Sequence, residues 1–441
     1  MAQKDCQDHE LSGATQEAAH RLDEAMRAFT LVYGDPIGFL DAAIESAPEC
    51  TMAWLTKAWV NALSNDPKGV AAAGKLAEQS RALSSNAREQ AHAAALELTV
   101  KGEWEAAVAV LDRLLMEHPR DVLAHQLALR LDGFQGRFHL GAARSARALP
   151  QWSTETPGYG LMLSLYGFGL EELGDYGRAE DVSREAADRE PLGYWPHHAV
   201  SHVMEMTGRA DEGVRWMEQR APLWSTALHG NRSHIWWHKA LFHIELGEYG
   251  KALGLYDGDI LPALRPVGTS LCNGSALLWR LETLGCEADA RWAALAELWS
   301  DRATGALSPF NDIHAAMTFL RADRRREYEA LRDAMRRSAR VGGGLATTYR
   351  SVGVPVVEAL DQFTRGDFAG AVETLMPVRH ELWRMGGSKA QRDVVEWTLV
   401  EAANRARDRK VSKALANERL AARPASAPNR HFERAATAIA A

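Results

Sequence analysis

The sequence predicts an all-α protein in which antiparallel helix pairs repeat along the chain and stack into a superhelix, an α-solenoid. Three observations support this prediction. The composition, with 46% hydrophobic and 25% charged residues over 441 positions, is that of a globular protein, and its many Ala, Leu, Glu and Arg residues favour helix. A glycine turn recurs at an interval that is typical of helix–turn–helix repeats. The chain also carries no good strand signal.

The repeated turn consists of a glycine, a charged residue, often an aromatic residue and, a few places on, alanine, as in KGEWEAA at 101–107 and LGEYGKA at 246–252. Up to residue 285 the turn glycines follow one another every 34 to 39 residues, and the last gap of 81 residues spans two units, with an inferred turn near Arg324. This period predicts roughly eight to ten helix pairs of the tetratricopeptide type. The turn glycines are Gly102, Gly136, Gly174, Gly208, Gly247, Gly285 and Gly366.

Each part of the turn has a physical role. Glycine supplies the left-handed backbone that ends the first helix, and the aromatic residue covers the groove between the paired helices. One pair cannot bury its apolar stripe alone, so neighbouring pairs stack into one core. We therefore expect a single solenoid domain over 13–441 after a polar tail at 1–12. The first helix of each pair is expected to line a concave cavity rich in histidine and tryptophan.

Charge and cysteine content narrow the function classes. A net charge of −7 argues against a nucleic-acid binder. The arginine-rich stretch 321–340 is interleaved with acidic residues and is interpreted as a solvated, salt-bridged face. Four scattered cysteines without C-x-x-C suit a reducing compartment. No apolar run of membrane-spanning length and no signal core is present, so we expect a cytoplasmic protein that does not bind membranes.

Histidines recur at matched positions of the repeat. His92 and His198 lie ten residues before their turn glycines, His238 lies nine before, and His314 lies ten before the inferred turn. His202 and His243 precede their glycines by six and four residues. Since positions ten and six before the turn share a helix face, several first helices are expected to present histidine at one level of the inner wall. For any one of these histidines alone, a structural role between helices is the simpler interpretation.

Two histidine pairs at i, i+4, His198/His202 and His234/His238, have a spacing that suits a metal ion. However, no H-E-x-x-H is present, and Glu205 and Glu245 are the only acidic partners nearby. The sequence therefore predicts neither a bound metal nor another cofactor.

Further candidate ligand-binding residues surround these histidines. Two adjacent tryptophans on a helix must point in different directions, so one of Trp236 and Trp237, which we take to be Trp237, is expected to face the groove. Asn311 and Asp312 begin the helix that carries His314.

The segment 384–399 adds two more candidates. Ser388 and Gln391 form a capping box, which explains those two residues. Lys389 and Arg392 are not explained by capping, and a lysine at a helix start opposes the helix dipole, which suggests a partner.

Several segments resemble the tetratricopeptide repeat protein 38 family. The resemblance implies an α-solenoid and covers most of the chain. The sequence departs from the family pattern at Lys389, where the family has histidine, and at Asn273, where it has aspartate. The segments are NAREQAHAAALEL at 86–98, WWHKALFHIELGEYGKALGLYD at 236–257, LLWRLE at 277–282, FNDIHAAM at 310–317 and GGSKAQRDV at 386–394.

The sequence also looks like the repeat protein encoded with toxoflavin-type azapteridine biosynthesis. That resemblance implies a role in secondary metabolism, in the maturation of a flat, nitrogen-rich heterocycle by an oxidation without a bound cofactor.

Three functional hypotheses follow. The first is a small-molecule enzyme, an oxidoreductase acting on a flat N-heterocycle, with His202, His238 and His314 as acid–base catalysts. Its ligand-binding residues are His92, His198, His234, Trp237, His243, Asn311, Asp312, Lys389 and Arg392. The second is a non-enzymatic tetratricopeptide-type scaffold that binds a protein or peptide partner. The third is a metal-dependent enzyme that uses the two histidine pairs.

Overall fold

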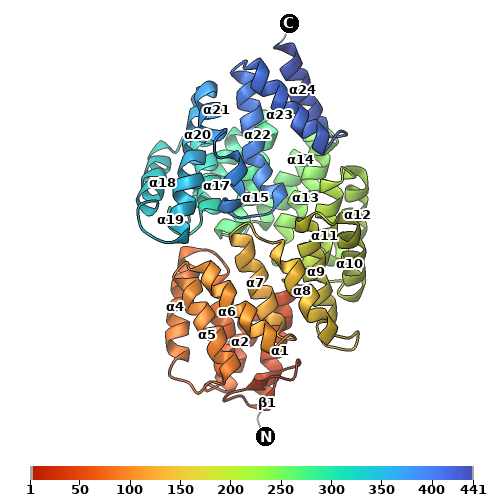
Figure 1. Cartoon of the computed structure of the whole chain (residues 1–441), viewed down its shortest axis with the longest axis vertical. Coiled ribbons are helices and arrows are strands. Elements are labelled where there is room, and N and C mark those ends of the chain that lie inside the picture. The colour runs from red at the N-terminus through yellow and green to blue at the C-terminus, as the bar shows by residue number, and fades with distance from the viewer. Residues whose placement is uncertain (1–2, 440–441) are drawn as a thin grey trace. The chain divides into compact units, whose positions relative to one another are not determined.

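The structure of the chain is a computed structural model, which describes residues 3–439. Within these residues it contains 24 α-helices and two two-residue strands, and the helices follow one another as antiparallel pairs (Figure 1). The predicted all-α, tetratricopeptide-like repeat class is therefore confirmed.

The chain divides into two compact units. Unit 1 comprises the described residues up to 133, together with 137–200 and 221–231, and unit 2 comprises 134–136, 201–220 and the described residues from 232 onward. The single solenoid domain over 13–441 stays a prediction, since compact units of this kind also arise within one continuous row of repeats. Three helices contribute residues to both units: α7 (Val122–Phe134), α11 (Tyr194–Met206) and α12 (Ala210–Trp224).

Unit 1 holds the two strands and ten helices. They are β1 (Gln3–Lys4), β2 (Glu10–Leu11), α1 (Gln16–Leu31), α2 (Pro36–Ser46), α3 (Thr51–Ala62), α4 (Pro67–Ser80), α5 (Ala87–Val100), α6 (Trp104–Glu117), α7 (Val122–Phe134), α8 (Leu140–Ala148), α9 (Tyr159–Leu173) and α10 (Tyr176–Arg189).

Unit 2 holds the remaining helices. They are α13 (Arg232–Glu245), α14 (Tyr249–Leu255), α15 (Gly268–Thr283), α16 (Asp289–Trp299), α17 (Pro309–Arg321), α18 (Arg325–Ser338), α19 (Gly344–Thr348), α20 (Val354–Thr364), α21 (Phe368–Leu375), α22 (Lys389–Arg405), α23 (Arg409–Ala422) and α24 (Ala427–Ala438).

Short 3-10 and π turns extend or connect these helices. The 3-10 turns are Leu149–Gln151, Leu261–Ala263 and Arg379–Met385, and the π turns are Tyr256–Ile260 and Tyr349–Gly353.

The segment 1–12, expected as a polar tail, contains the β1–β2 hairpin, and Asp5 within it is buried and forms an ion pair with Arg88. These strands could not be predicted from the sequence. A strand is recognised by alternating apolar and polar positions, and two residues are too few to show that alternation.

The predicted turns are present. All seven turn glycines have positive φ, between 68° and 96°. The inferred turn near Arg324 exists without glycine: Asp323 takes the left-handed conformation with φ 55°, and the amide of Arg324 donates to the carbonyl of Phe319 at 2.8 Å. The same hydrogen bond, from the residue after the turn to the carbonyl five positions earlier, ends the first helix of other pairs, as from Glu248 to His243.

The described chain contains eleven such pairs, against the roughly eight to ten that we expected. The turns that end α1, α3 and α22 place Val32, Asn65 and Arg407 at positive φ. Because these turns use no glycine at the left-handed position, they leave no mark in the periodic glycine pattern.

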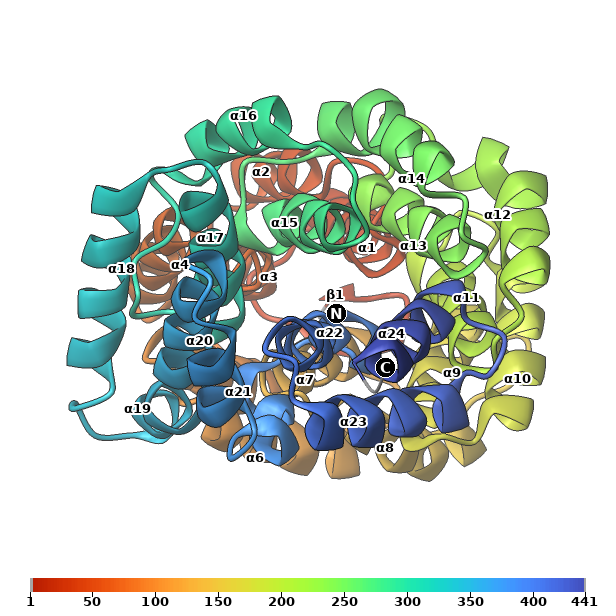
Figure 2. The ribbon, with the colours of Figure 1, turned by 90° about the horizontal axis from the view of Figure 1, so that it is seen from above.

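In unit 2 the first helices of successive pairs lie on the inner side and the second helices on the outer side, which Figure 2 shows for α13, α15 and α17 against α14, α16 and α18. The inner row turns back on itself, since α22 packs against α15. The indole of Trp279 donates to Thr398 at 2.9 Å, and the indole of Trp397 donates to Thr283 at 2.8 Å. The inner face of unit 2 is therefore rich in tryptophan, as expected, but these side chains are buried against one another.

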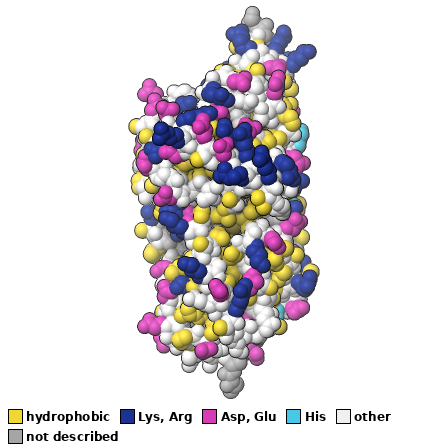
Figure 3. Space-filling view, turned by 90° about the vertical axis from the view of Figure 1, so that its left-hand side faces the viewer, with side chains coloured by type: hydrophobic (Ala, Val, Ile, Leu, Met, Phe, Trp, Pro, Cys, Tyr) yellow, Lys and Arg dark blue, Asp and Glu magenta, His cyan; other side chains and the backbone are white. Residues whose placement is uncertain are grey.

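The arginine-rich stretch around α18 is a salt-bridged surface, as predicted. Arg324 pairs with Glu297 and Glu327, and Arg336 pairs with Glu358. Figure 3 shows basic and acidic side chains side by side on the upper part of the face to which α18 belongs.

Two substitutions test the repeat turns. We expect Asp323→Gly to raise the free energy of unfolding by up to ~1 kcal/mol, because glycine removes the strain of a left-handed aspartate. We expect Gly285→Ala to lower it by about 1 kcal/mol, because a side chain there meets no atom within 4 Å and only the backbone strain at φ 91° remains. Thermal unfolding followed by circular dichroism measures both, and a shift of both melting temperatures in the same direction would contradict this account.

Candidate functional site

Three buried histidines converge from α11 and α13 in unit 2. His202 lies on α11, and His234 and His238 lie one turn apart on α13, so their imidazoles share a helix face. The rings of His202 and His238 have centroids 4.6 Å apart, and those of His234 and His238 are 4.7 Å apart. His202 and His238 have no exposed surface and His234 is 6% exposed. Of the predicted site residues, the structure brings these three together.

The histidines belong to a hydrogen-bonded chain of four side chains. Glu205 Oε2 lies 3.2 Å from His238 Nδ1, His238 Nε2 lies 3.2 Å from His234 Nε2, and His234 Nδ1 lies 2.7 Å from Asn273 Oδ1. The amide nitrogen of Asn273 is buried without a hydrogen-bond partner. The chain therefore links α11, α13 and α15 through side chains alone.

The protons of this chain can be arranged in two ways that satisfy every contact. If Asn273 accepts from His234 Nδ1, then His238 donates from Nε2 and a protonated Glu205 donates to His238 Nδ1. If the Asn273 amide is turned over, it donates to His234, His234 donates to His238, and His238 donates to an ionised Glu205. The first arrangement holds one proton more than the second, so the loss of one proton, together with rotation of the Asn273 amide, converts the first into the second.

Burial sets the titration of these groups. It raises the pKa of Glu205 to about 7, although Arg423 and His202 favour the ionised form. It holds the pKa of His238 well below the ordinary value of histidine, and the positive charges nearby act in the same direction. His238 is therefore a neutral imidazole, and it lies beside the carboxyl group of Glu205, which titrates near neutral pH.

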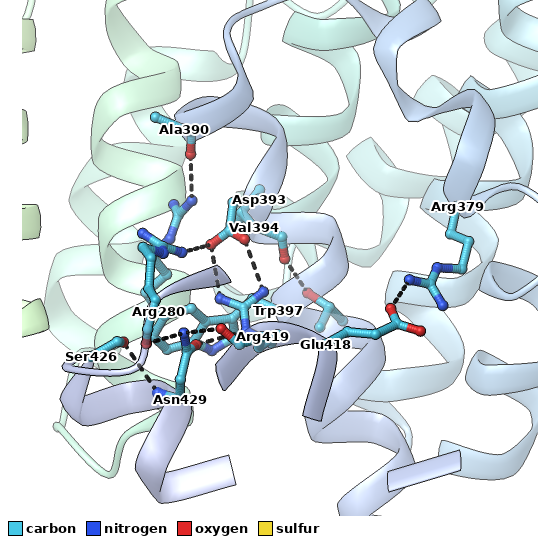
Figure 4. A network of polar contacts seen from close by, with 12 residues as sticks. Arg280, Arg379, Ala390, Asp393, Val394, Trp397, Glu418, Arg419, Ser426 and Asn429 are labelled. Carbon is cyan, nitrogen blue, oxygen red and sulfur yellow. Dashed lines mark hydrogen bonds and ion pairs between the residues drawn. The ribbon is translucent and has the colours of Figure 1, made fainter. Parts of the chain in front are cut away.

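An arginine–carboxylate network, of which Figure 4 shows the part around Asp393, reaches the histidine cluster through Glu205. Asp393 on α22 accepts from Arg419 at 2.8 and 3.1 Å and pairs with Arg423 at 3.4 Å. Arg423 also pairs with Glu245 at 3.0 Å and lies 3.8 Å from Glu205. Burial alone would raise the pKa of Asp393, but the arginines hold it far below its usual value.

Arg280 occupies the centre of this region on α15. It is 2% exposed, and its guanidinium donates to the carbonyl oxygens of Ala276 at 3.1 Å and Ala390 at 3.0 Å. Burial lowers the pKa of Arg280 to about 10. Sequence reasoning did not find it, although an arginine inside the apolar run LLWRLE at 277–282 was a usable signal.

Trp237 packs on the histidine cluster. Its ring stacks on His234 with a centroid distance of 5.1 Å and an angle of 14°, and the guanidinium carbon of Arg280 lies 5.8 Å from the centroid of the Trp237 ring. Trp237 is 1% exposed, whereas Trp236 is partly exposed and lies beside Lys239. The two neighbours thus point differently, as predicted, and Trp237 lies in the core of unit 2.

Two predicted histidines belong to unit 1 and pack there. His92 Nε2 lies 2.9 Å from Asp121, whose carboxylate also accepts from Arg88 at 2.7 Å. His198 stacks on Tyr194 with a centroid distance of 4.7 Å and contacts Phe168. These contacts give both imidazoles a role in helix packing.

The residues predicted at the start of α17 are also buried. His314 Nδ1 donates to the carbonyl of Phe310 at 2.8 Å, and burial lowers its pKa to about 4. Asp312 accepts from the Tyr349 hydroxyl at 2.6 Å and from the amide of Gly305 at 3.1 Å. Asn311 accepts from the Cys272 thiol at 3.5 Å.

The remaining candidates lie elsewhere. His243 pairs with Glu248 at 2.7 Å, Lys389 is exposed at the start of α22, and Arg392 donates to the carbonyl of Gly387. The capping box of Ser388 and Gln391 is present as predicted. The structure does not gather these residues with the histidine cluster, and the roles assigned to all the candidates stay predictions.

His202, His234 and His238 are the residues of unit 2 that could hold a metal ion. Each offers a ring nitrogen, and these nitrogens lie within 4.8 Å of one another. Nitrogen ligands of this kind suit Zn²⁺ and similar ions.

Comparison with known proteins gives a remote likeness in fold. No family model matches the chain, so the resemblance to the tetratricopeptide repeat protein 38 family stays a prediction. A human IFIT1 dimer solved with m7Gppp-AAAA is 13% identical over 98% of this chain and 96% of its own, with a TM-score of 0.39. A monomeric IFIT1 mutant with the same ligand is 13% identical over 97% and 96%, with a TM-score of 0.41. No residue role is transferred from them.

These structures correct our expectation about partners. From the net charge we had excluded nucleic acid and expected a heterocyclic small molecule as the ligand. Both of these chains were solved with m7Gppp-AAAA, and the exclusion of nucleic acid as a partner is therefore withdrawn. Net charge alone was a poor guide, because a local surface rather than the sum of all charges contacts a ligand.

Among the described residues, no helix combines the length and the apolar character that crossing a membrane requires.

The buried carboxyl of Asp312 gives a prediction about pH. Burial raises its pKa to about 7, although Tyr349 and two backbone amides favour the ionised form, and Cys272 is a further titratable neighbour. The pKa of Asp312 is higher in the folded chain than in the unfolded chain, so its protonated form stabilises the fold. This stabilisation is complete below about pH 4 and is lost as the pH rises through 7. Asp312→Asn should remove this dependence, which amounts to a few kcal/mol at most.

Melting temperatures of the wild type and the variant between pH 5 and 8 test this prediction. As the pH rises, the melting temperature of the wild type should fall relative to that of Asp312→Asn. A difference between the two melting temperatures that does not depend on pH would contradict the prediction.

Proposed function

We propose that this chain is a tetratricopeptide-type scaffold without catalytic activity, which binds a segment of a partner protein in a cleft on the outer side of unit 2. The cleft carries the proposal. It lies between α12, the end of α13 and α14, and has a volume of about 620 Å³. Its lining residues are Asp211, Val214, Arg215, Glu218, Lys239, His243, Leu246, Glu248, Lys251, Gly254 and Leu255.

The chemistry of the lining suits a peptide. Val214, Leu246 and Leu255 provide an apolar part that can take one hydrophobic side chain. Charged residues of both signs surround it, and several are paired with one another, such as Lys239 with Glu218 at 3.1 Å and Lys251 with Glu248 at 2.7 Å. Surface pairs of this kind contribute at most about 1 kcal/mol, so they can exchange partners at small cost.

The expected occupant is a segment with an apolar residue between an acidic and a basic one. Its acidic side chain would meet Arg215 or Lys251, and its basic side chain would meet Asp211 or Glu218. Gly254 leaves the backbone of α14 open at the cleft, since a side chain there would meet no atom within 4 Å. The volume lies in the range of 300–1,000 Å³ that is usual for ligand sites.

The scaffold also accounts for the predicted acid–base residues better than an enzyme does. His238 and His314 are each at most 1% exposed and have structural partners. Membership of the tetratricopeptide repeat protein 38 family is part of this proposal and is supported by the sequence segments named above.

A substitution at Gly254 tests the cleft. Peptides selected by phage display on the full-length protein should share an apolar residue flanked by opposite charges. Gly254→Tyr should weaken their binding at least ~10-fold, because the ring fills the cleft while the helix gains propensity. Gly177→Tyr in α10 is the matched control, since that glycine is also exposed on a helix with no atom within 4 Å of an added side chain.

Isothermal titration calorimetry measures the dissociation constants. The proposal is overturned if no peptide is enriched over an unrelated protein, or if the selected peptides bind Gly254→Tyr as tightly as the wild type.

A further inference from the structure

The histidine cluster has a feature that neither the fold nor the scaffold function explains. His202, His234 and His238 place three ring nitrogens within 4.8 Å of one another in the interior of unit 2. Stacking of helix pairs needs small or aliphatic residues at such positions, whereas imidazoles bring polar atoms that must be satisfied there. Three of them from two neighbouring helices indicate a shared ligand.

The geometry of the pair on α13 is that of two metal ligands. His234 Nε2 and His238 Nε2 lie 3.2 Å apart. Two nitrogens that bind one tetrahedral ion at the usual Zn–N distance of about 2.0–2.1 Å are separated by roughly 3.3 Å. The observed separation therefore allows one ion to be bound by both rings with little rearrangement.

The opposite sides of the same two rings are held as metal-bound histidines usually are. His238 Nδ1 faces the carboxyl group of Glu205 at 3.2 Å, and His234 Nδ1 faces Asn273 Oδ1 at 2.7 Å. When both Nδ1 atoms donate to these oxygens, both Nε2 atoms carry a lone pair and point at each other. Such an arrangement is repulsive unless a cation lies between them, and it matches the support that oxygen acceptors give to metal-ligating imidazoles.

We propose that His202, His234 and His238 bind one divalent transition-metal ion of the Zn²⁺ class, which ties α11 to α13. Three nitrogen ligands without an oxygen ligand favour such an ion over Mg²⁺ or Ca²⁺. This proposal departs from the prediction from sequence that no metal is bound and takes up the alternative in which the histidine pairs hold one.

Burial assigns the ion a structural role. The three ligands are between 0 and 6% exposed, so a substrate of any size cannot reach the ion without movement of the helices. The charges near the ion are largely compensated. Two arginines, Arg280 and Arg423, lie close to three carboxyl groups, those of Glu205, Glu245 and Asp393. The ion joins two successive helix pairs, and its binding is coupled to their folding.

The metal content of the full-length protein is the first test. Protein purified without chelator and dialysed against buffer containing Zn²⁺ should carry one zinc per chain by inductively coupled plasma mass spectrometry. Removal of the ion with EDTA should lower the melting temperature by roughly 5–15 °C, and added Zn²⁺ should restore it. Cobalt-loaded protein should show the visible absorption of a tetrahedral site.

Matched variants separate the metal from packing. His234→Gln and His238→Gln should each lose the zinc and the response of the melting temperature to EDTA. His314→Gln, which removes another buried imidazole of unit 2 outside the cluster, should retain both. Asn273→Leu should keep the fold and weaken zinc binding ~10–100-fold, because it removes the acceptor that orients His234.

Three results would overturn the proposal. One is wild-type protein that takes up no stoichiometric zinc or cobalt. Another is a melting temperature that EDTA and Zn²⁺ leave unchanged. The third is zinc retained in His234→Gln and His238→Gln at the level of the His314→Gln control.

Discussion

The return of α22 onto α15 is the contact on which the interior of unit 2 depends. A row of stacked helix pairs normally leaves its inner helices open on one side, but here the last inner helix closes against an earlier one. Trp279 and Trp397 from the two helices cross-link through hydrogen bonds to threonine hydroxyls on the opposite helix. The inner side chains of the row are thereby removed from water, and every polar group among them needs a partner within the unit.

That requirement explains the arginine–carboxylate network. Arg280 lies in the last turn of α15, where α22 covers it, and its guanidinium donates to backbone carbonyls of both helices. Asp393, Arg419 and Arg423 bring further charge into the same region, and Glu245 and Glu205 balance it. Burying any one of these charged side chains alone would cost desolvation free energy. Pairing side chains of opposite charge reduces that cost. The histidine cluster lies at the edge of this network through Glu205.

The packing of α22 against α15 also makes the inner and outer faces of unit 2 different. The polar side chains of the inner helices are paired with one another and buried. They are therefore not accessible to a large partner. The outer cleft between α12 and α14 keeps apolar and charged side chains available at the surface. In the two proposals made above, the buried histidine cluster binds a metal ion between two helix pairs, and the outer cleft binds the partner.

The sequence by itself determined the repeat. Helix pairing, the seven turn glycines, the turn near Arg324, the salt-bridged face of α18 and the capping box at Ser388 all depend on residues close together in the chain. The pairing of His234 with His238 was also visible, since four residues span one helical turn.

Only the tertiary structure decided which histidines meet and what surrounds them. His202 and His238 lie on different helices, Asn273 comes from a third, and Arg280 becomes buried because α22 returns from more than a hundred residues away. His92 and His314 lie ten residues before their turns, one position from the place of His238 in its repeat, yet an aspartate and a backbone carbonyl contact them instead. Repeat position fixes the direction of a side chain on its own helix, and the neighbours that it meets depend on how distant helices pack.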